Sequence, residues 1–158
     1  MEEQGIRDSV TGVYSRLYFE EQLELEVLRG IRRGVAFSIL LVEIDGFEAF
    51  GARHGDSAIE GLLLHIAEIA RDRLRGADRL FRFGDHGFVA ILPETPRANA
   101  AIPAEGIREA VSQADPSELV PEAPNARVTA TVTVVGFPDD GEDVTTLMGK
   151  LLQRSSSS

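Results

Sequence analysis

The chain has 158 residues, of which 16 are basic and 26 acidic, so its formal net charge is −10. Its length predicts one domain with room for an ordinary hydrophobic core. This charge argues against a protein that binds DNA or RNA through many phosphate contacts, but it allows a small anion to bind at a local cluster of arginines. The absence of cysteine excludes disulfides and cysteine-ligated zinc.

The sequence also argues against membrane insertion. No apolar run approaches the roughly 18 residues that span a bilayer. The first ten residues lack the basic and apolar regions of a signal peptide. Together with the missing cysteines, these features predict a cytoplasmic location.

The first half of the chain alternates between helical and strand patterns. Residues 15–30 are typical of an amphipathic helix that ends at Gly30. Its apolar stripe comprises Leu17, Leu23, Val27 and Leu28. Residues 35–44 form a nearly continuous apolar run, which predicts a central strand covered on both faces. After a short helical or turn segment, residues 57–76 have the strongest helical periodicity in the chain.

The second half begins with two short apolar runs around the loop GDHG at residues 84–87, which predict a hairpin. A helix over 99–113 with Asn99 as its N-cap, a strand over 126–137 and a helix over 144–154 follow. This order predicts an α/β sandwich with a mixed sheet, a central hairpin and helices on both faces. We expect a single domain over residues 1–154 and a flexible serine tail at 155–158.

Four segments in this order resemble the GGDEF (diguanylate cyclase) domain family. They are DSVTGVYSR at 8–16, similar to D-x-LTGLxNR; VEIDGF at 42–47, similar to DxDxF; RFGDHGFVAILP at 82–93, similar to RYGGDEFAVLLP; and VTATVTVVG at 128–136, similar to VTVSIGVA. The resemblance covers roughly residues 8–150. It implies a three-layer sandwich of the nucleotidyl-cyclase kind and a bacterial signalling protein.

In that family, two GTP molecules are condensed to cyclic di-GMP with divalent metals held by carboxylates. The resemblance places Glu43 at the first metal-binding position, and His86 and Gly87 at the two acidic positions of GGDEF. Asp85 replaces the second glycine, where a side chain adds bulk and negative charge beside phosphate. We therefore predict a catalytically inactive domain that requires no cofactor and does not use Mg²⁺.

The positions that would recognise GTP have changed as well. The family's phosphate-contacting lysine falls on Glu48, which reverses the charge. Its guanine-reading asparagine falls on Gly51, which has no side chain, and its second guanine-reading residue falls on Glu60. These changes add to the expectation that GTP is not turned over.

A second site of the family is an R-x-x-D motif five residues before GGDEF, where the product binds. Arg75-Gly76-Ala77-Asp78 has this offset from Gly84. A guanidinium can bond guanine O6 and N7, and a carboxylate can accept from guanine N1 and N2. Arg79, and Arg108 in a segment similar to the family's AERIR helix, are candidates to neutralise the phosphates. The resemblance thus implies a cyclic di-GMP receptor, with a possible ligand-bridged homodimer.

Less specific interpretations stay open. R-x-x-D occurs three times, also at Arg53–Asp56 and Arg82–Asp85, where about one occurrence is expected by chance. Arg75 and Asp78 can therefore be an ordinary surface ion pair. The spacing of the three histidines, at 54, 65 and 86, fits no usual metal pattern.

Three hypotheses follow. The first is an inactive receptor that passes a cyclic di-GMP signal to a protein partner or an attached domain. The second is an interaction scaffold that binds no nucleotide. The third is a residual GTP binder that uses Glu43 and Asp45 with one metal. Asp8, Thr11 and Arg16 are expected to cap and position the first helix.

Overall fold

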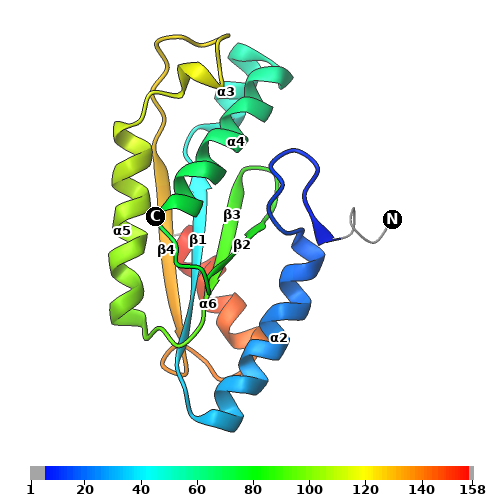
Figure 1. The fold of residues 1–158 in the computed structure, drawn as a ribbon, viewed down its shortest axis with the longest axis vertical. Coiled ribbons are helices and arrows are strands. Elements are labelled where there is room, and N and C mark those ends of the chain that lie inside the picture. The colour runs from blue at the N-terminus through cyan, green and yellow to red at the C-terminus, as the bar shows by residue number, and fades with distance from the viewer. Residues whose placement is uncertain (1–5, 157–158) are drawn as a thin grey trace.

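The computed structural model describes residues 6–156 as a four-stranded sheet flanked by helices (Figure 1). The strands are β1 Phe37–Ile44, β2 Arg79–Arg82, β3 Gly87–Leu92 and β4 Ala130–Phe137. The helices are α2 Arg16–Arg33, α3 Phe47–His54, α4 Asp56–Asp72, α5 Arg97–Gln113 and α6 Val144–Ser156, with a short 3₁₀ turn η1 at Pro116–Glu118. The predicted α/β fold class is confirmed.

The strands lie in the order β2-β3-β1-β4, and every pairing between them is antiparallel. The prediction of a mixed sheet is therefore wrong for these four strands. Within residues 6–156, a parallel pairing occurs only as an isolated bridge between Tyr14 and Phe81. Helices α3 and α4 connect β1 to the hairpin of β2 and β3, and the second strand of this hairpin, β3, pairs antiparallel with β1.

The sheet has a separate hydrophobic core on each face. Leu40 and Val42 of β1 pack with side chains of α4 and α5, whereas Ile39 and Leu41 pack with side chains of α2 and α6. Successive side chains of a strand point to opposite faces, so a strand between two helical layers is apolar at nearly every position. This confirms the prediction that residues 35–44 contain a doubly covered strand.

Helix α2 differs from its prediction at the C-terminal end and on one face. Its N-cap is Ser15, whose side chain accepts from the Tyr18 backbone N–H, and the helix ends at Gly34, which has a φ of 67°. Gly30 lies inside the helix, where an added Cβ would stand 2.6 Å from the Phe137 ring. Leu17 and Leu28, which the sequence assigns to the apolar stripe of this helix, are 61% and 55% exposed.

Other boundaries also move. Helix α5 begins at Arg97 with Pro96 at the N-cap, so Asn99 is not the cap. Helix α6 continues through Ser156, so the first two residues of the predicted serine tail are helical, and 157–158 lie outside the described residues. No helix among residues 6–156 has both the length and the apolarity to span a bilayer.

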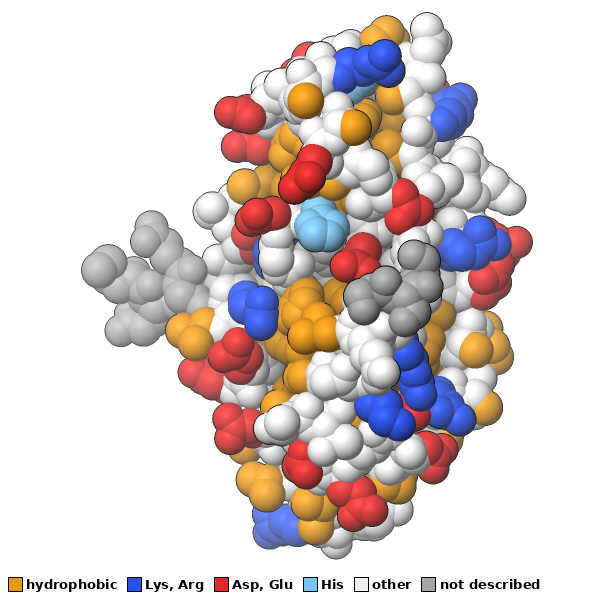
Figure 2. Space-filling view, turned by 180° about the vertical axis from the view of Figure 1, so that it is seen from behind, with side chains coloured by type: hydrophobic (Ala, Val, Ile, Leu, Met, Phe, Trp, Pro, Cys, Tyr) orange, Lys and Arg blue, Asp and Glu red, His pale blue; other side chains and the backbone are white. Residues whose placement is uncertain are grey.

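Figure 2 shows the molecule from behind, with acidic and basic side chains arranged around a hydrophobic area near the middle. The two signs are interspersed on this face.

Candidate functional site

The first candidate site lies where β1 meets the tip of the β2–β3 hairpin. The register of β1 and β3 places Glu43 opposite Gly87. The Oε2 atom of Glu43 lies 3.7 Å from Nε2 of His86, so an imidazole faces the carboxylate. The His86 ring also lies 5.8 Å from the ring of Phe47. Of the three positions that the resemblance assigns to metal binding, residue 43 carries a carboxylate, residue 86 an imidazole and residue 87 no side chain.

Asp45, the second carboxylate of this region, accepts hydrogen bonds from two threonine hydroxyls. Its Oδ2 accepts a hydrogen bond from Thr129 Oγ1 at 2.7 Å, and its Oδ1 accepts from Thr131 Oγ1 at 2.8 Å. No group of three His, Asp or Glu side chains among residues 6–156 is arranged to hold a metal ion. The described side chains around Glu43 and Asp45 therefore do not form a three-ligand metal centre.

Gly87 packs closely against two backbone carbonyl groups. A Cβ at this position would stand 2.7 Å from the carbonyl oxygen of Val42 and 3.3 Å from that of Phe83. A side chain at residue 87 would therefore require the hairpin or β1 to shift. Beside it lies a hollow of about 460 Å³ lined by Glu48 and His86, with neither lysine nor arginine in its lining. A triphosphate in this hollow would meet a carboxylate in place of a cation.

The second candidate site is the turn between α4 and β2. Asp78 Oδ2 accepts the backbone N–H of Arg75 at 2.8 Å, and Asp78 Oδ1 lies 3.3 Å from Arg75 Nη2. The Asp78 side chain is 2% exposed, whereas that of Arg75 is 62% exposed. Asp78 thus closes the turn and holds the guanidinium, which also donates to Thr95 Oγ1 at 2.6 Å and to the Pro93 carbonyl at 3.3 Å.

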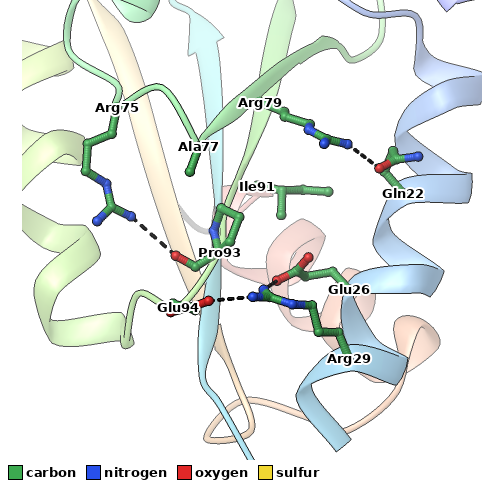
Figure 3. A pocket seen from close by; sticks show the side chains of 9 residues that line it. All are labelled: Gln22, Glu26, Arg29, Arg75, Ala77, Arg79, Ile91, Pro93 and Glu94. Atoms are coloured by element: carbon green, nitrogen blue, oxygen red, sulfur yellow. Dashed lines mark hydrogen bonds and ion pairs between the residues drawn. The ribbon is translucent and has the colours of Figure 1, made fainter. Parts of the chain in front are cut away.

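Three surface hollows share Arg75. The largest, of about 520 Å³, lies between α2 and the β2–β3 side of the sheet (Figure 3). A second, of about 370 Å³, is also lined by Arg7, Arg71 and Arg79. A third, of about 460 Å³, is lined by Arg73 at the end of α4 and by Ile102 on α5. Arg75 therefore stands where three concave surfaces meet.

The hollow in Figure 3 has its own network of polar contacts. Arg79 donates to the side-chain oxygen of Gln22 on α2. Arg29 forms an ion pair with Glu26 at 3.2 Å and another with Glu94, whose backbone has a φ of 53°. Three guanidinium groups and two carboxylates thus line one hollow, and the contacts between them join α2 to the end of β3.

The structure separates Arg79 from Arg108, the two arginines predicted to bind phosphate. Arg79 lines two of the hollows together with Arg75. Arg108 lines none of the three and instead pairs with Glu105 one turn earlier on α5, at 2.5 Å. This hydrogen bond lowers the pKa of Glu105 below its usual range. Gly106 lines the third hollow on this part of α5.

Sequence reasoning missed four arginines at the second site: Arg7, Arg29, Arg71 and Arg73. Arg71 and Arg73 precede Arg75 by four and two residues, so the basic run at the end of α4 was a usable signal. Arg29 is distant from Arg75 in the sequence and lines the hollow because α2 packs beside β2 and β3. No local pattern could have indicated it.

The remaining motif residues have structural roles. Asp8 accepts from the backbone and hydroxyl of Thr11 and forms an ion pair with Arg82 at 3.3 Å. Arg82 also donates to the Asp85 backbone carbonyl at 2.8 Å. The N-terminal motif therefore holds the hairpin loop in place, and Ser15, rather than Asp8 or Thr11, caps the first helix.

The fold places β1 between β4 and the β2–β3 hairpin, with the R-x-x-D turn between α4 and β2. The chain belongs to the family described as "Diguanylate cyclase, GGDEF domain", whose profile matches residues 6–153.

Related proteins agree with this assignment. The chain is 28% identical to the bifunctional diguanylate cyclase/cyclic di-GMP phosphodiesterase MucR and 32% identical to the diguanylate cyclase DgcP, both from Pseudomonas aeruginosa. These matches cover 87% and 90% of the chain but 20% and 21% of the relatives, so the chain spans about a fifth of their length. The GGDEF domain of DgcB from Caulobacter crescentus, solved in complex with cyclic di-GMP, superimposes with a TM-score of 0.87 at 18% identity. That match covers 97% of this chain and 89% of that one.

Proposed function

We propose that this GGDEF domain is catalytically inactive and acts as a cyclic di-GMP receptor through Arg75. One observation carries the proposal: an exposed guanidinium is held in place by a buried carboxylate at the junction of three hollows. Positioning an arginine in this way reduces the side-chain entropy that ligand binding must overcome. The output passes to a protein partner or an attached domain.

The proposed recognition divides the work among the residues of the turn. Arg75 bonds O6 and N7 of a guanine base. Arg79 and Arg29, in the same hollow, lie within reach of the phosphates of the same ligand or of a second stacked molecule. Asp78 acts first as a positioning residue, because its oxygens already bond the Arg75 backbone and side chain. It reaches guanine N–H groups only if Arg75 releases Oδ1.

The proposed inactivity rests on the first site. Gly87 supplies no ligand, Asp45 is bonded to two threonine hydroxyls, and Glu43 faces His86. Phosphoryl transfer between two nucleotides depends on metal ions that neutralise the phosphates. The same contacts of Asp45 argue against residual GTP binding through Glu43 and Asp45.

Binding to fluorescent cyclic di-GMP, measured by anisotropy on the wild-type chain and two variants, tests the receptor proposal. Arg75→Ala should weaken binding by about 5- to 150-fold, because a bidentate guanine contact is worth about 1–3 kcal/mol. Arg53→Ala is the matched control: it removes the arginine of another R-x-x-D pair and should leave affinity unchanged. Equal affinities of the wild type and Arg75→Ala would refute the assignment.

A scaffold function is the second candidate, and a specific observation favours it. Arg75 already bonds Asp78, Thr95 and Pro93, and Arg29 already bonds Glu26 and Glu94. A ligand must therefore replace existing contacts. If the wild-type chain shows neither binding nor a thermal shift with cyclic di-GMP, the scaffold interpretation takes precedence.

A further inference from the structure

The side of α2 that faces away from the sheet carries four large apolar side chains. Leu17, Leu25, Leu28 and Ile31 are 61%, 58%, 55% and 58% exposed. The buried residues of the same helix, including Phe19 and Leu23, lie on the opposite side. At 3.6 residues per turn, the four exposed residues fall within about a third of the helix circumference. We call them the α2 outer stripe.

Charged residues flank the α2 outer stripe, and the sign of their charge changes along the helix. Glu20, Glu21 and Glu24 lie in its first half, and Arg32 and Arg33 lie in its last turn. Among the ion pairs of residues 6–156, none uses Glu21, Glu24, Arg32 or Arg33. Arg16 pairs with Glu20, so the charges of α2 that form no ion pair within residues 6–156 are acidic in the first half and basic in the last turn.

We propose that this face binds a second copy of the chain, with the two α2 helices antiparallel about a twofold axis. When the axis passes between residues 26 and 27, Leu25 lies opposite Leu28 of the partner subunit. The same register places Glu21 opposite Arg32 of the partner subunit. Each contact then occurs twice, as in any isologous interface.

The order of charges selects this arrangement over a parallel one. In a parallel pair with equal register, Glu21 would face its own copy and Arg32 would face its own copy. Like charges brought together in this way disfavour the pair, whereas the antiparallel pair matches opposite charges at both ends. A helix that is acidic in its first half and basic at its end is complementary to itself.

The surface is small, so the association should be weak and depend on concentration. It needs no ligand, because the stripe lies on the outer side of α2 and includes neither Arg75 nor Arg79. The self-association is therefore separate from the proposed cyclic di-GMP site. A dimer of Arg75→Ala without ligand would support it even if the receptor proposal failed.

Sedimentation equilibrium of the ligand-free chain, over concentrations up to about 1 mM, provides the test. The wild type should show an average mass that rises with concentration above the 17.2 kDa of the monomer. Glu21→Arg and Arg32→Glu alone should each weaken dimerisation at least tenfold, and the double variant should restore it to within about threefold, because the pairs re-form with opposite sense. Leu28→Gln should abolish dimerisation.

Leu152→Gln is the matched control, since Leu152 is an exposed leucine on α6 and lies outside the stripe. It should leave the dimer unchanged. Unchanged thermal unfolding temperatures of all variants would show that the monomers fold normally. A wild type that stays at 17.2 kDa, or a double charge reversal that fails to restore association, would overturn the proposal.

Discussion

Replacing Asp140 by asparagine should destabilise the fold by about 2 kcal/mol at neutral pH. The carboxylate is 3% exposed and joins three elements: Oδ1 accepts from Arg154 of α6 at 2.7 Å and from Arg97 of α5 at 2.8 Å. Its Oδ2 accepts the Gly136 backbone N–H of β4 at 2.8 Å. Chiefly the Arg154 hydrogen bond, together with that from Gly136, lowers the pKa of Asp140 from 3.8 to about 2. At about 1.36 kcal/mol per pH unit, this difference gives the stated magnitude.

The sign of the pH dependence follows from the lowered pKa. The unfolded chain binds a proton at Asp140 more readily than the folded chain does, so this contribution is fully present above about pH 5 and is lost as pH falls through about 4 to 2. Urea unfolding of the wild type and Asp140→Asn should therefore differ by about 2 kcal/mol at pH 7 and by roughly half of that at pH 3.

Asp139→Asn is the control, because Asp139 is the exposed neighbour in the same turn. Its free energy of unfolding should stay within about 0.5 kcal/mol of the wild-type value. Equal stabilities of the wild type and Asp140→Asn at pH 7, or a difference between them that does not shrink towards pH 3, would refute the reasoning.

The remaining predictions concern packing, a buried histidine and turnover. Gly61→Ala should destabilise the fold by about 1–3 kcal/mol in urea unfolding, because its Cβ would stand 2.0 Å from the Leu119 carbonyl oxygen. Gly149→Ala on α6 should stabilise the fold by about 0.5–1 kcal/mol, because its Cβ would meet no atom within 4 Å and alanine favours the helix. Nε2 of His65 is buried and has no hydrogen-bond partner among residues 6–156, and burial lowers its pKa below 6.5. Stability should therefore fall as pH drops through about 6.5, and His65→Leu should flatten this decline; parallel profiles would contradict it. Chromatography should detect no cyclic di-GMP made from GTP with Mg²⁺ or Mn²⁺, and turnover by the unmodified chain would refute the proposed inactivity.

The element order could be predicted because apolar periodicity is a local property. Residues 37–44 are apolar at nearly every position, and their doubly covered strand was foreseen from this run. The N-cap of α5 was misplaced because Pro96 is at the N-cap without a side-chain hydrogen bond, whereas Asn99 is a typical capping residue. Sheet parallelism was also misjudged, since it depends on how the hairpin docks on β1.

At the R-x-x-D turn, the sequence predicted the features that depend on residue spacing but not those that depend on packing. The offset of Arg75 from the hairpin located the turn, but not the burial of Asp78, which depends on how tightly the turn closes. The interpretation of the α2 stripe failed for Leu17 and Leu28 because apolar residues occur on two sides of this helix. Periodicity alone does not indicate which of two apolar faces packs on the sheet.

The most direct test of the central claim is a calorimetric titration of the unmodified 158-residue chain with cyclic di-GMP. The account predicts saturable heat with a dissociation constant in the micromolar range or below, and weaker binding as salt is added, because arginines contact the phosphates. No heat at ligand concentrations up to about 1 mM would contradict it, since a held guanidinium in a hollow with two further arginines should reach at least that affinity.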